Sequence, residues 1–278
     1  MSENNNNSIK ILDLDSIFEK SVREAMMKNK GKFTEDEWED KIAKMYSEFG
    51  NAPLKILDGK SPEEYYKSFS ANELADALKK HVLNKVAVPS YLCDALSASD
   101  CVDALMPFLD ESDPELICYA ANILSEKKDL QPLKVFLEKI TRDETNEDVR
   151  DCMGSAVIDR AKEIQPELLK VKGNAGKGEL FVAEALSHCD MKQEIFDYLS
   201  GLFTNATEPD EIGLYACFLT NYGDDRAVEL FKRRITDPDI DYAVYTDLKS
   251  FIEELGGECD YIRDFSDDYS YKKIKNFS

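Results

Sequence analysis

The stretch DPELICYAANILSEKKDLQPLKVFLEKI, residues 113–140, predicts the fold more directly than any other part of the chain. Asp113-Pro114 is typical of a helix start, because an aspartate can cap free backbone amides and a proline fits the first turn. Apolar residues then recur at helical spacing on both sides of the polar turn 126–129. They are Leu116, Ala120, Ala121 and Leu124 before the turn and Leu133, Phe136, Leu137 and Ile140 after it. This pattern predicts a helical hairpin.

The opening of this hairpin recurs along the chain as an acidic residue placed directly before an aliphatic one. The aliphatic residues are Leu116, Val149, Leu180, Ile212 and Ile240. They are separated by 33, 31, 32 and 28 residues, a nearly constant period that is typical of a helical solenoid. Each hairpin has apolar residues that only a neighbouring hairpin can cover, so we expect the repeats to depend on one another for stability.

Two of these units resemble the short HEAT-like repeats of the phycobilin-lyase type. The residues that carry the resemblance are Asp113, Pro114, Leu116, Ala120, Ala121, Leu124, Leu133 and Leu137, echoed by Asp210, Ile212, Ala216, Leu219, Ala227 and Leu230. The resemblance covers about residues 88–256 and implies an all-α fold, a right-handed α-solenoid of helical hairpins. The sequence departs from the family at 173–178, a glycine-rich stretch expected to form a flexible turn or hinge. It also has Ile117 where the family often has arginine.

The regions that flank the repeats lack this period, so the chain is expected to have four parts. These are a disordered Asn-rich start at residues 1–10, an N-terminal helical module at 11–86, the HEAT-like array at 87–256 and a C-terminal capping helix or tail at 257–278. In the module, helices are expected to begin after the capping residues Thr34, Ser61 and Ser70, and Gly50 is expected to end one.

Aromatic residues recur near the C-terminus of the chain. Tyr261, Phe265 and Tyr269 are spaced four residues apart, which would place them on one side of a final helix. We expect that helix to cap the open end of the repeats. A mobile tail that docks on a partner is the alternative.

The charge balance disfavours two classes of partner. The chain has 56 acidic and 35 basic residues and a net charge of −21. A field of this sign repels phosphate backbones and anionic lipid headgroups, so we expect neither nucleic acid nor a membrane as partner. Two explanations of the acidity stay open, namely solubility and a face that meets a basic protein.

The sequence also bears on the compartment. Residues 1–8 are polar and Asn-rich, unlike an export signal, and no apolar stretch approaches the length needed to span a bilayer. The seven cysteines are scattered, and most lie among apolar residues, as buried thiols do in a reducing compartment. We therefore expect a cytoplasmic protein without a structural disulfide.

Two loops suggest ligand chemistry, but each lacks a required residue. The glycine-rich stretch 173–178 has neither the first glycine nor the final serine or threonine of a phosphate-binding loop. Asp237, Asp239 and Asp241 alternate as in a calcium loop, yet Tyr242 stands in place of the glycine that the turn needs. We expect both loops to be structural.

The two histidines, His81 and His188, lie outside any metal-ligand spacing. Cys189 follows His188 directly, so on a helix the two side chains would point about 100° apart and would not form a nucleophile–base pair. Close pairs of carboxylates are inevitable in so acidic a chain and indicate nothing by themselves. We expect no catalytic residue, no metal and no cofactor.

These observations favour a non-catalytic, monomeric scaffold or adaptor that binds a protein partner on the concave face of the array. If the second helix of each hairpin lines that face, eight charged residues would contact the partner. They are Lys134, Glu138, Lys192, Asp197, Arg226, Glu229, Lys232 and Arg233. Two other readings stay open: a helical enzyme or lyase-type HEAT-repeat protein that acts on a protein or small molecule, and an acidic mimic of nucleic acid.

Overall fold

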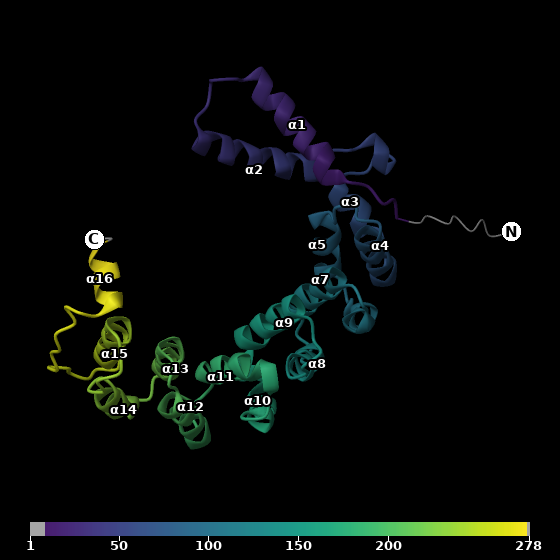
Figure 1. The fold of residues 1–278 in the computed structure, drawn as a ribbon. Helices are drawn as coiled ribbons and strands as arrows, with labels where there is room; N and C mark the ends of the chain where they lie inside the picture. Colours follow the sequence, from purple (N-terminus) through teal and green to yellow (C-terminus); the bar gives the residue numbers. More distant parts are fainter. Residues whose placement is uncertain (1–8, 277–278) are drawn as a thin grey trace. The chain divides into compact units, whose positions relative to one another are not determined.

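The computed structural model describes residues 9–276, and all regular structure in this range is helical. The described residues form 16 α-helices and no strand, with 69% of the chain in helix, so the all-α prediction is confirmed. None of these helices is long and apolar enough to cross a membrane. The chain divides into two units, Met1–Pro132 and Leu133–Ser278 (Figure 1). This division falls inside the predicted array 87–256, and the four predicted parts stay predictions.

The first unit begins with a hairpin of two long helices and continues with shorter ones. Its elements are α1 (Leu14–Lys28), α2 (Glu35–Asn51), η1 (Lys55–Leu57), α3 (Pro62–Lys67), α4 (Ala71–Leu83), α5 (Ser90–Ala98), α6 (Val102–Leu105), η2 (Met106–Asp110) and α7 (Pro114–Ser125). Thr34, Ser61 and Ser70 each cap a helix and form a reciprocal capping box with the glutamate three residues later. The three predicted helix starts are therefore confirmed.

Two expectations for the N-terminal region need correction. Most of the predicted disordered start, residues 1–8, lies outside the described residues. Ile9 is buried, however, and the amide of Lys10 donates a hydrogen bond of 2.8 Å to the Tyr65 hydroxyl, so these two residues are held in place. Gly50 does not end α2 but lies buried inside it. A Cβ at Gly50 would come within 2.8 Å of the Tyr91 ring, so this glycine allows close packing against α5.

The second unit alternates two kinds of helix. Its elements are α8 (Gln131–Ile140), which begins at the unit boundary, α9 (Glu147–Asp159), η3 (Ala161–Ile164), α10 (Gln165–Val171), η4 (Gly176–Gly178), α11 (Glu179–Ser187), α12 (Gln193–Asn205), α13 (Pro209–Tyr222), α14 (Ala227–Arg234), α15 (Tyr242–Glu254) and α16 (Tyr269–Asn276). We call α9, α11, α13 and α15 the first helices and α8, α10, α12 and α14 the second helices. Successive first helices pack directly on one another, and the second helices lie on the other side of this row (Figure 1).

Fully buried residues recur along these helices at intervals similar to those of the acidic–aliphatic openings. Ala120, Met153, Val182, Ala216 and Leu248 are fully buried at corresponding positions, 33, 29, 34 and 32 residues apart. By contrast, Leu180 is 43% exposed, and Ile240 lies before α15 begins. The opening at Leu180 thus lies at the start of α11, as predicted, although its side chain is exposed, whereas the opening at Ile240 lies two residues before α15.

The glycine-rich stretch 173–178 is a fixed turn, contrary to the prediction of a flexible hinge. The carboxylate of Glu179 accepts hydrogen bonds from the amides of Gly173 (2.6 Å) and Ala175 (2.8 Å). Gly178 packs so closely on α8 that a Cβ would lie 2.5 Å from the Ile140 carbonyl oxygen. Two amides that a phosphate could have used are thus already bonded to a carboxylate, which supports a structural role for this loop.

The C-terminal prediction of one helix through Tyr261, Phe265 and Tyr269 is also wrong. Residues 257–268 are not helical, and α16 begins only at Tyr269. Phe265 is instead buried against α15, with its ring centroid 4.8 Å from that of Tyr245, whose hydroxyl donates to the Tyr261 carbonyl at 2.7 Å. The four-residue spacing of the aromatics therefore comes from packing of an irregular segment, not from helical periodicity.

Candidate partner-binding surface

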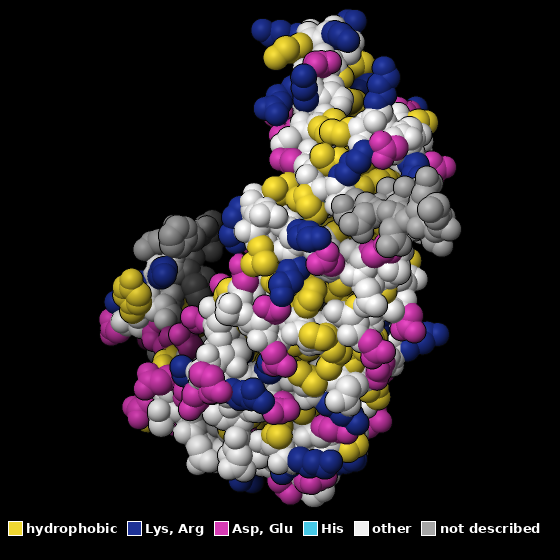
Figure 2. Space-filling model, turned by 90° about the vertical axis from the view of Figure 1, so that its right-hand side faces the viewer, with side chains coloured by type: hydrophobic (Ala, Val, Ile, Leu, Met, Phe, Trp, Pro, Cys, Tyr) yellow, Lys and Arg dark blue, Asp and Glu magenta, His cyan; other side chains and the backbone are white. Residues whose placement is uncertain are grey.

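One face of the molecule, drawn in Figure 2, carries acidic and basic side chains interspersed with hydrophobic ones. The eight predicted partner-binding residues all reach solvent in the second unit, seven of them exposed and Lys232 half-buried. Six of them lie within α8, α12 and α14. Lys192 and Arg226 are the residues directly before α12 and α14. The structure thus places them along the second helices, as the hairpin pattern predicted.

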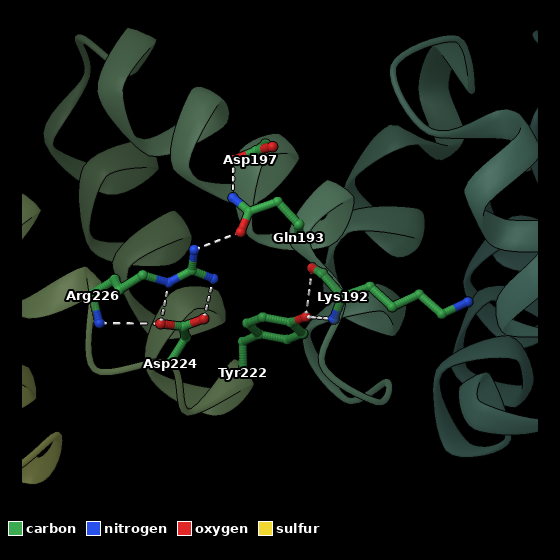
Figure 3. Close-up of polar contacts among 6 residues, drawn as sticks. All are labelled: Lys192, Gln193, Asp197, Tyr222, Asp224 and Arg226. Atoms are coloured by element: carbon green, nitrogen blue, oxygen red, sulfur yellow. Dashed lines mark hydrogen bonds and ion pairs between the residues drawn. The ribbon is translucent and has the colours of Figure 1, made fainter.

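The structure brings two of these residues, Asp197 and Arg226, into one network, drawn in Figure 3. The Arg226 guanidinium donates to Asp224 and, at 2.7 Å, to the side-chain oxygen of Gln193. Gln193 in turn donates to Asp197 at 2.7 Å. Arg226 also lies over the Phe196 ring, 4.0 Å from its centroid, which favours a cation–π contact. Arg226 therefore links α14 to α12, and its bonds hold the pKa of Asp224 below its usual value.

Lys192, next to Gln193 in the chain, forms separate hydrogen bonds through its backbone. The Tyr222 hydroxyl accepts a hydrogen bond from the Lys192 amide and donates one of 3.0 Å to the Lys192 carbonyl. The ammonium group of Lys192 points away from these contacts (Figure 3). A partner could therefore reach this cation without disturbing the turn that precedes α12.

Four of the five remaining predicted residues form ion pairs, and Arg233 is the exception among the described residues. Lys134 lies 3.1 Å from Glu167, Glu138 is bonded to Arg142, and Lys232 lies 4.0 Å from Glu229. Such solvent-exposed pairs contribute little to stability, and side chains in them can exchange one partner for another. These charges are balanced within the chain but still accessible.

A small groove opens between α12 and α14. It has a volume of about 260 Å³ and is lined by Phe203, Thr204, Leu230, Arg233, Arg234 and Asp237. Arg234 is committed to the fold, because it donates to the Ala206 carbonyl at 2.7 Å. Arg233 is exposed and forms no ion pair with any described residue. The groove is smaller than most small-molecule pockets and better suited to one side chain of a protein partner.

Charge is sorted between the two rows of helices. The first helices contain eleven acidic residues, four in α9, two each in α11 and α13 and three in α15, and only two basic ones, Arg150 and Lys249. The second helices contain five acidic and six basic residues. Since Arg150 is buried, the solvent-facing side of the first helices is almost purely acidic. The sequence analysis missed this side entirely.

The cysteine next to His188 lacks the properties of a nucleophile. Cys189 is buried, and burial raises the pKa of its thiol to about 11, whereas a nucleophilic cysteine needs a lowered pKa. Among the residues that the structure describes, no group of three His, Cys, Asp or Glu side chains could hold a metal ion.

His81 is fully buried on α4 and has an incomplete set of hydrogen bonds. Its Nδ1 lies 2.8 Å from the Ala87 carbonyl oxygen, which fixes the proton on that nitrogen, and its Nε2 is buried with no hydrogen-bond partner among the described residues. Burial lowers the pKa of His81 below its ordinary value of 6.5. Protonation is therefore disfavoured in the folded state.

This histidine predicts a pH dependence of stability. Below pH 6.5 the unfolded chain binds a proton at His81 that the folded chain does not, so the free energy of unfolding should fall as the pH drops from 6.5 to 5.5, by up to about 1.4 kcal/mol per unit. Urea unfolding of the wild type and His81→Gln over this range measures the effect. His81→Gln should make the free energy of unfolding less dependent on pH, whereas the exposed control His188→Gln should leave the dependence unchanged. The same dependence on pH in all three proteins would contradict its assignment to His81.

No model of a known protein family matches this chain, and no curated protein matches it either. The surface described above is therefore the basis for assigning a function. Its main features are two exposed rows of side chains with different charge and a small groove beside Arg233.

Proposed function

We propose that this protein is a non-catalytic scaffold of HEAT-like helical hairpins that binds a protein partner along its second helices. The observation that carries the proposal is the packing of α9, α11, α13 and α15 as successive first helices. A stack built in this way leaves an extended row of second-helix side chains in solvent, and such rows are the usual binding surfaces of helical repeat proteins. The exposed charges on α8, α12 and α14 support this use.

The second helices, which we propose to contact the partner, are not the helices that we expect on the concave side of the stack. Contacts between successive first helices are more extensive than those between successive second helices. In a curved stack the inner row is the more closely spaced, so we expect the first helices to line the inner side of any curvature. The predicted contacts on α8, α12 and α14 would then lie on the outer side.

We further propose that the scaffold acts as a monomer in the cytoplasm. No disulfide joins any cysteines in the described part of the chain, which suits a reducing compartment. The net charge of −21 opposes self-association through long-range repulsion.

Charge reversal on α14 tests the second-helix surface. Arg233 lines the groove and Lys232 precedes it on α14, and their side chains are bonded to the rest of the fold only weakly or not at all. Lys232→Glu with Arg233→Glu should therefore leave the melting temperature within about 2 °C of wild type. Recovery of a partner that the wild type captures from native extract should fall about tenfold or more, since reversed charges repel a partner selected for cations.

A matched variant controls for the change in net charge. Lys28→Glu with Lys30→Glu changes the charge equally on the exposed tip of the α1–α2 hairpin. It should capture the same partner as the wild type. Equal recovery by all three proteins would remove the second helices from the binding surface.

A further inference from the structure

We propose that the solvent-facing side of α11, α13 and α15 binds a basic, amphipathic helical segment of a protein partner. We call this side the acidic wall and define it by Leu180, Glu184, Leu214, Cys217, Asp247 and Glu254. The proposal extends the scaffold function to a second surface with its own ligand chemistry.

The first argument is a pair of exposed leucines. Leu180 is 43% and Leu214 37% exposed. They are 34 residues apart, as are the buried residues Val182 and Ala216, so they occupy corresponding positions on α11 and α13, which pack directly on each other. Two exposed leucines at the same place on adjacent helices add apolar surface to an otherwise charged side.

The second argument is the position of the carboxylates around this strip. Asp247 of α15 reaches α13, since its Oδ2 lies 3.5 Å from where a Cβ on Gly213 would be. Burial raises the pKa of the Cys217 thiol, and the nearby carboxylates of Glu184, Glu254 and Asp247 raise it further. Asp247 of α15 therefore lies against α13, and the carboxylates of Glu184 and Glu254 are near enough to act on Cys217 of the same helix.

The third argument is the absence of internal counterions on this side. Neither α11 nor α13 contains a lysine or arginine. In the described part of the chain, Glu184, Asp247 and Glu254 form no ion pair, in contrast to the charges on the second helices. Burial and the neighbouring Asp241 raise the pKa of Asp247, so this carboxylate is partly desolvated without a cation to compensate.

These features together favour one kind of ligand for the acidic wall. Acidity alone would be explained by solubility, but solubility does not favour leucines at the centre of the same surface. An amphipathic helix with apolar residues on one side and lysines or arginines beside them would cover the leucines and pair with the carboxylates. A second copy of this chain fits poorly, because two molecules of charge −21 repel each other.

The test uses the full-length protein and a synthetic probe. The probe is a fluorescein-labelled helical peptide of lysine and leucine, with leucines at i, i+3, i+4 and i+7, and its analogue has glutamate in place of every lysine. Fluorescence anisotropy at physiological ionic strength gives the Kd of each. We expect the lysine peptide to bind and the glutamate peptide to show no binding, since its charges are repelled by the acidic wall.

Two variants with equal charge changes locate the site. Glu184→Gln, Asp247→Asn and Glu254→Gln together should raise the Kd of the lysine peptide about tenfold or more. The control Glu138→Gln, Glu194→Gln and Glu229→Gln neutralises three carboxylates on second helices and should change the Kd about twofold or less. Leu180→Ser with Leu214→Ser should weaken binding without altering any charge.

The outcomes separate this proposal from the scaffold proposal. Equal Kd values for both neutralised variants, or no effect of the leucine substitutions, would overturn the acidic wall as a binding site. Lys232→Glu with Arg233→Glu should leave peptide binding intact, because these residues lie on the other row. If peptide binding fails while partner capture still depends on Lys232 and Arg233, only the acidic wall is refuted. If peptide binding succeeds while partner capture does not depend on Lys232 and Arg233, only the second-helix surface is refuted.

Discussion

Replacing Ala216 by arginine should unfold the second unit. Ala216 is fully buried on α13, which packs against α11, α12 and α15. An arginine there would overfill the site and bury a charge without a partner, and together these effects cost more than about 4 kcal/mol. Thermal unfolding followed by circular dichroism at 222 nm should show the melting temperature lowered by at least about 10 °C, or no folded baseline.

The same substitution at an exposed alanine is the control. Ala43 is exposed on α2, so Ala43→Arg should change the melting temperature by no more than about 2 °C. Ala120, buried on α7 at the corresponding repeat position, should respond like Ala216. Wild-type stability of Ala216→Arg would mean that the first helices do not pack as described.

The second large effect is expected at Arg150, a buried residue on α9. Its guanidinium donates to the carbonyls of Ile140 (3.3 Å), Arg142 (2.8 Å) and Asp143 (3.3 Å), which closes the turn between α8 and α9. Arg150→Met should lower the free energy of unfolding by about 2–4 kcal/mol, because one buried and two part-buried carbonyls lose their donors. Urea unfolding measures this change.

A lysine at the same position separates charge from geometry. Arg150→Lys keeps the cation but cannot reach several carbonyls with the fixed fork of a guanidinium, so it should recover only part of the loss. If Arg150→Met unfolded at the same urea concentration as the wild type, the turn would not depend on these hydrogen bonds.

Arg150 also shows what the sequence analysis could have found. It follows the aliphatic Val149, the position where HEAT-like repeats often have arginine. The unit at 113–140 has Ile117 at this position and so lacks the arginine, whereas the unit that begins at Asn146 has it. A comparison of all units would have singled out Arg150 before the structure did.

Helix starts were predictable because their causes are local. Thr34, Ser61 and Ser70 satisfy free amides within their own first turns, and no distant residue is needed. The repeat register at Leu180 depends on which side of α11 meets α9 and α13, a tertiary property. An acidic–aliphatic pair does not report it, so the exposure of Leu180 could not be predicted from the sequence.

The candidate surfaces were predictable to a similar extent. Exposure of the charged residues on α8, α12 and α14 followed from helical periodicity alone. The network around Arg226 depends on Gln193, which is 33 residues away and gives no sequence signal. The acidic wall becomes visible only when α11, α13 and α15 are placed side by side, since each contributes only two of its six residues.

The distance between labels on α11 and α15 tests the central claim that successive first helices pack side by side. Spin labels introduced as genetically encoded amino acids at Leu180 and Asp247 would leave the seven native cysteines unchanged. The steps from α11 to α13 and from α13 to α15 each separate helix axes by about 8–10 Å. Double electron–electron resonance should therefore give a single, narrow distribution of label distances centred at about 20 Å. A broad distribution, or a mean beyond about 35 Å, would contradict the stacked arrangement and, with it, both binding surfaces.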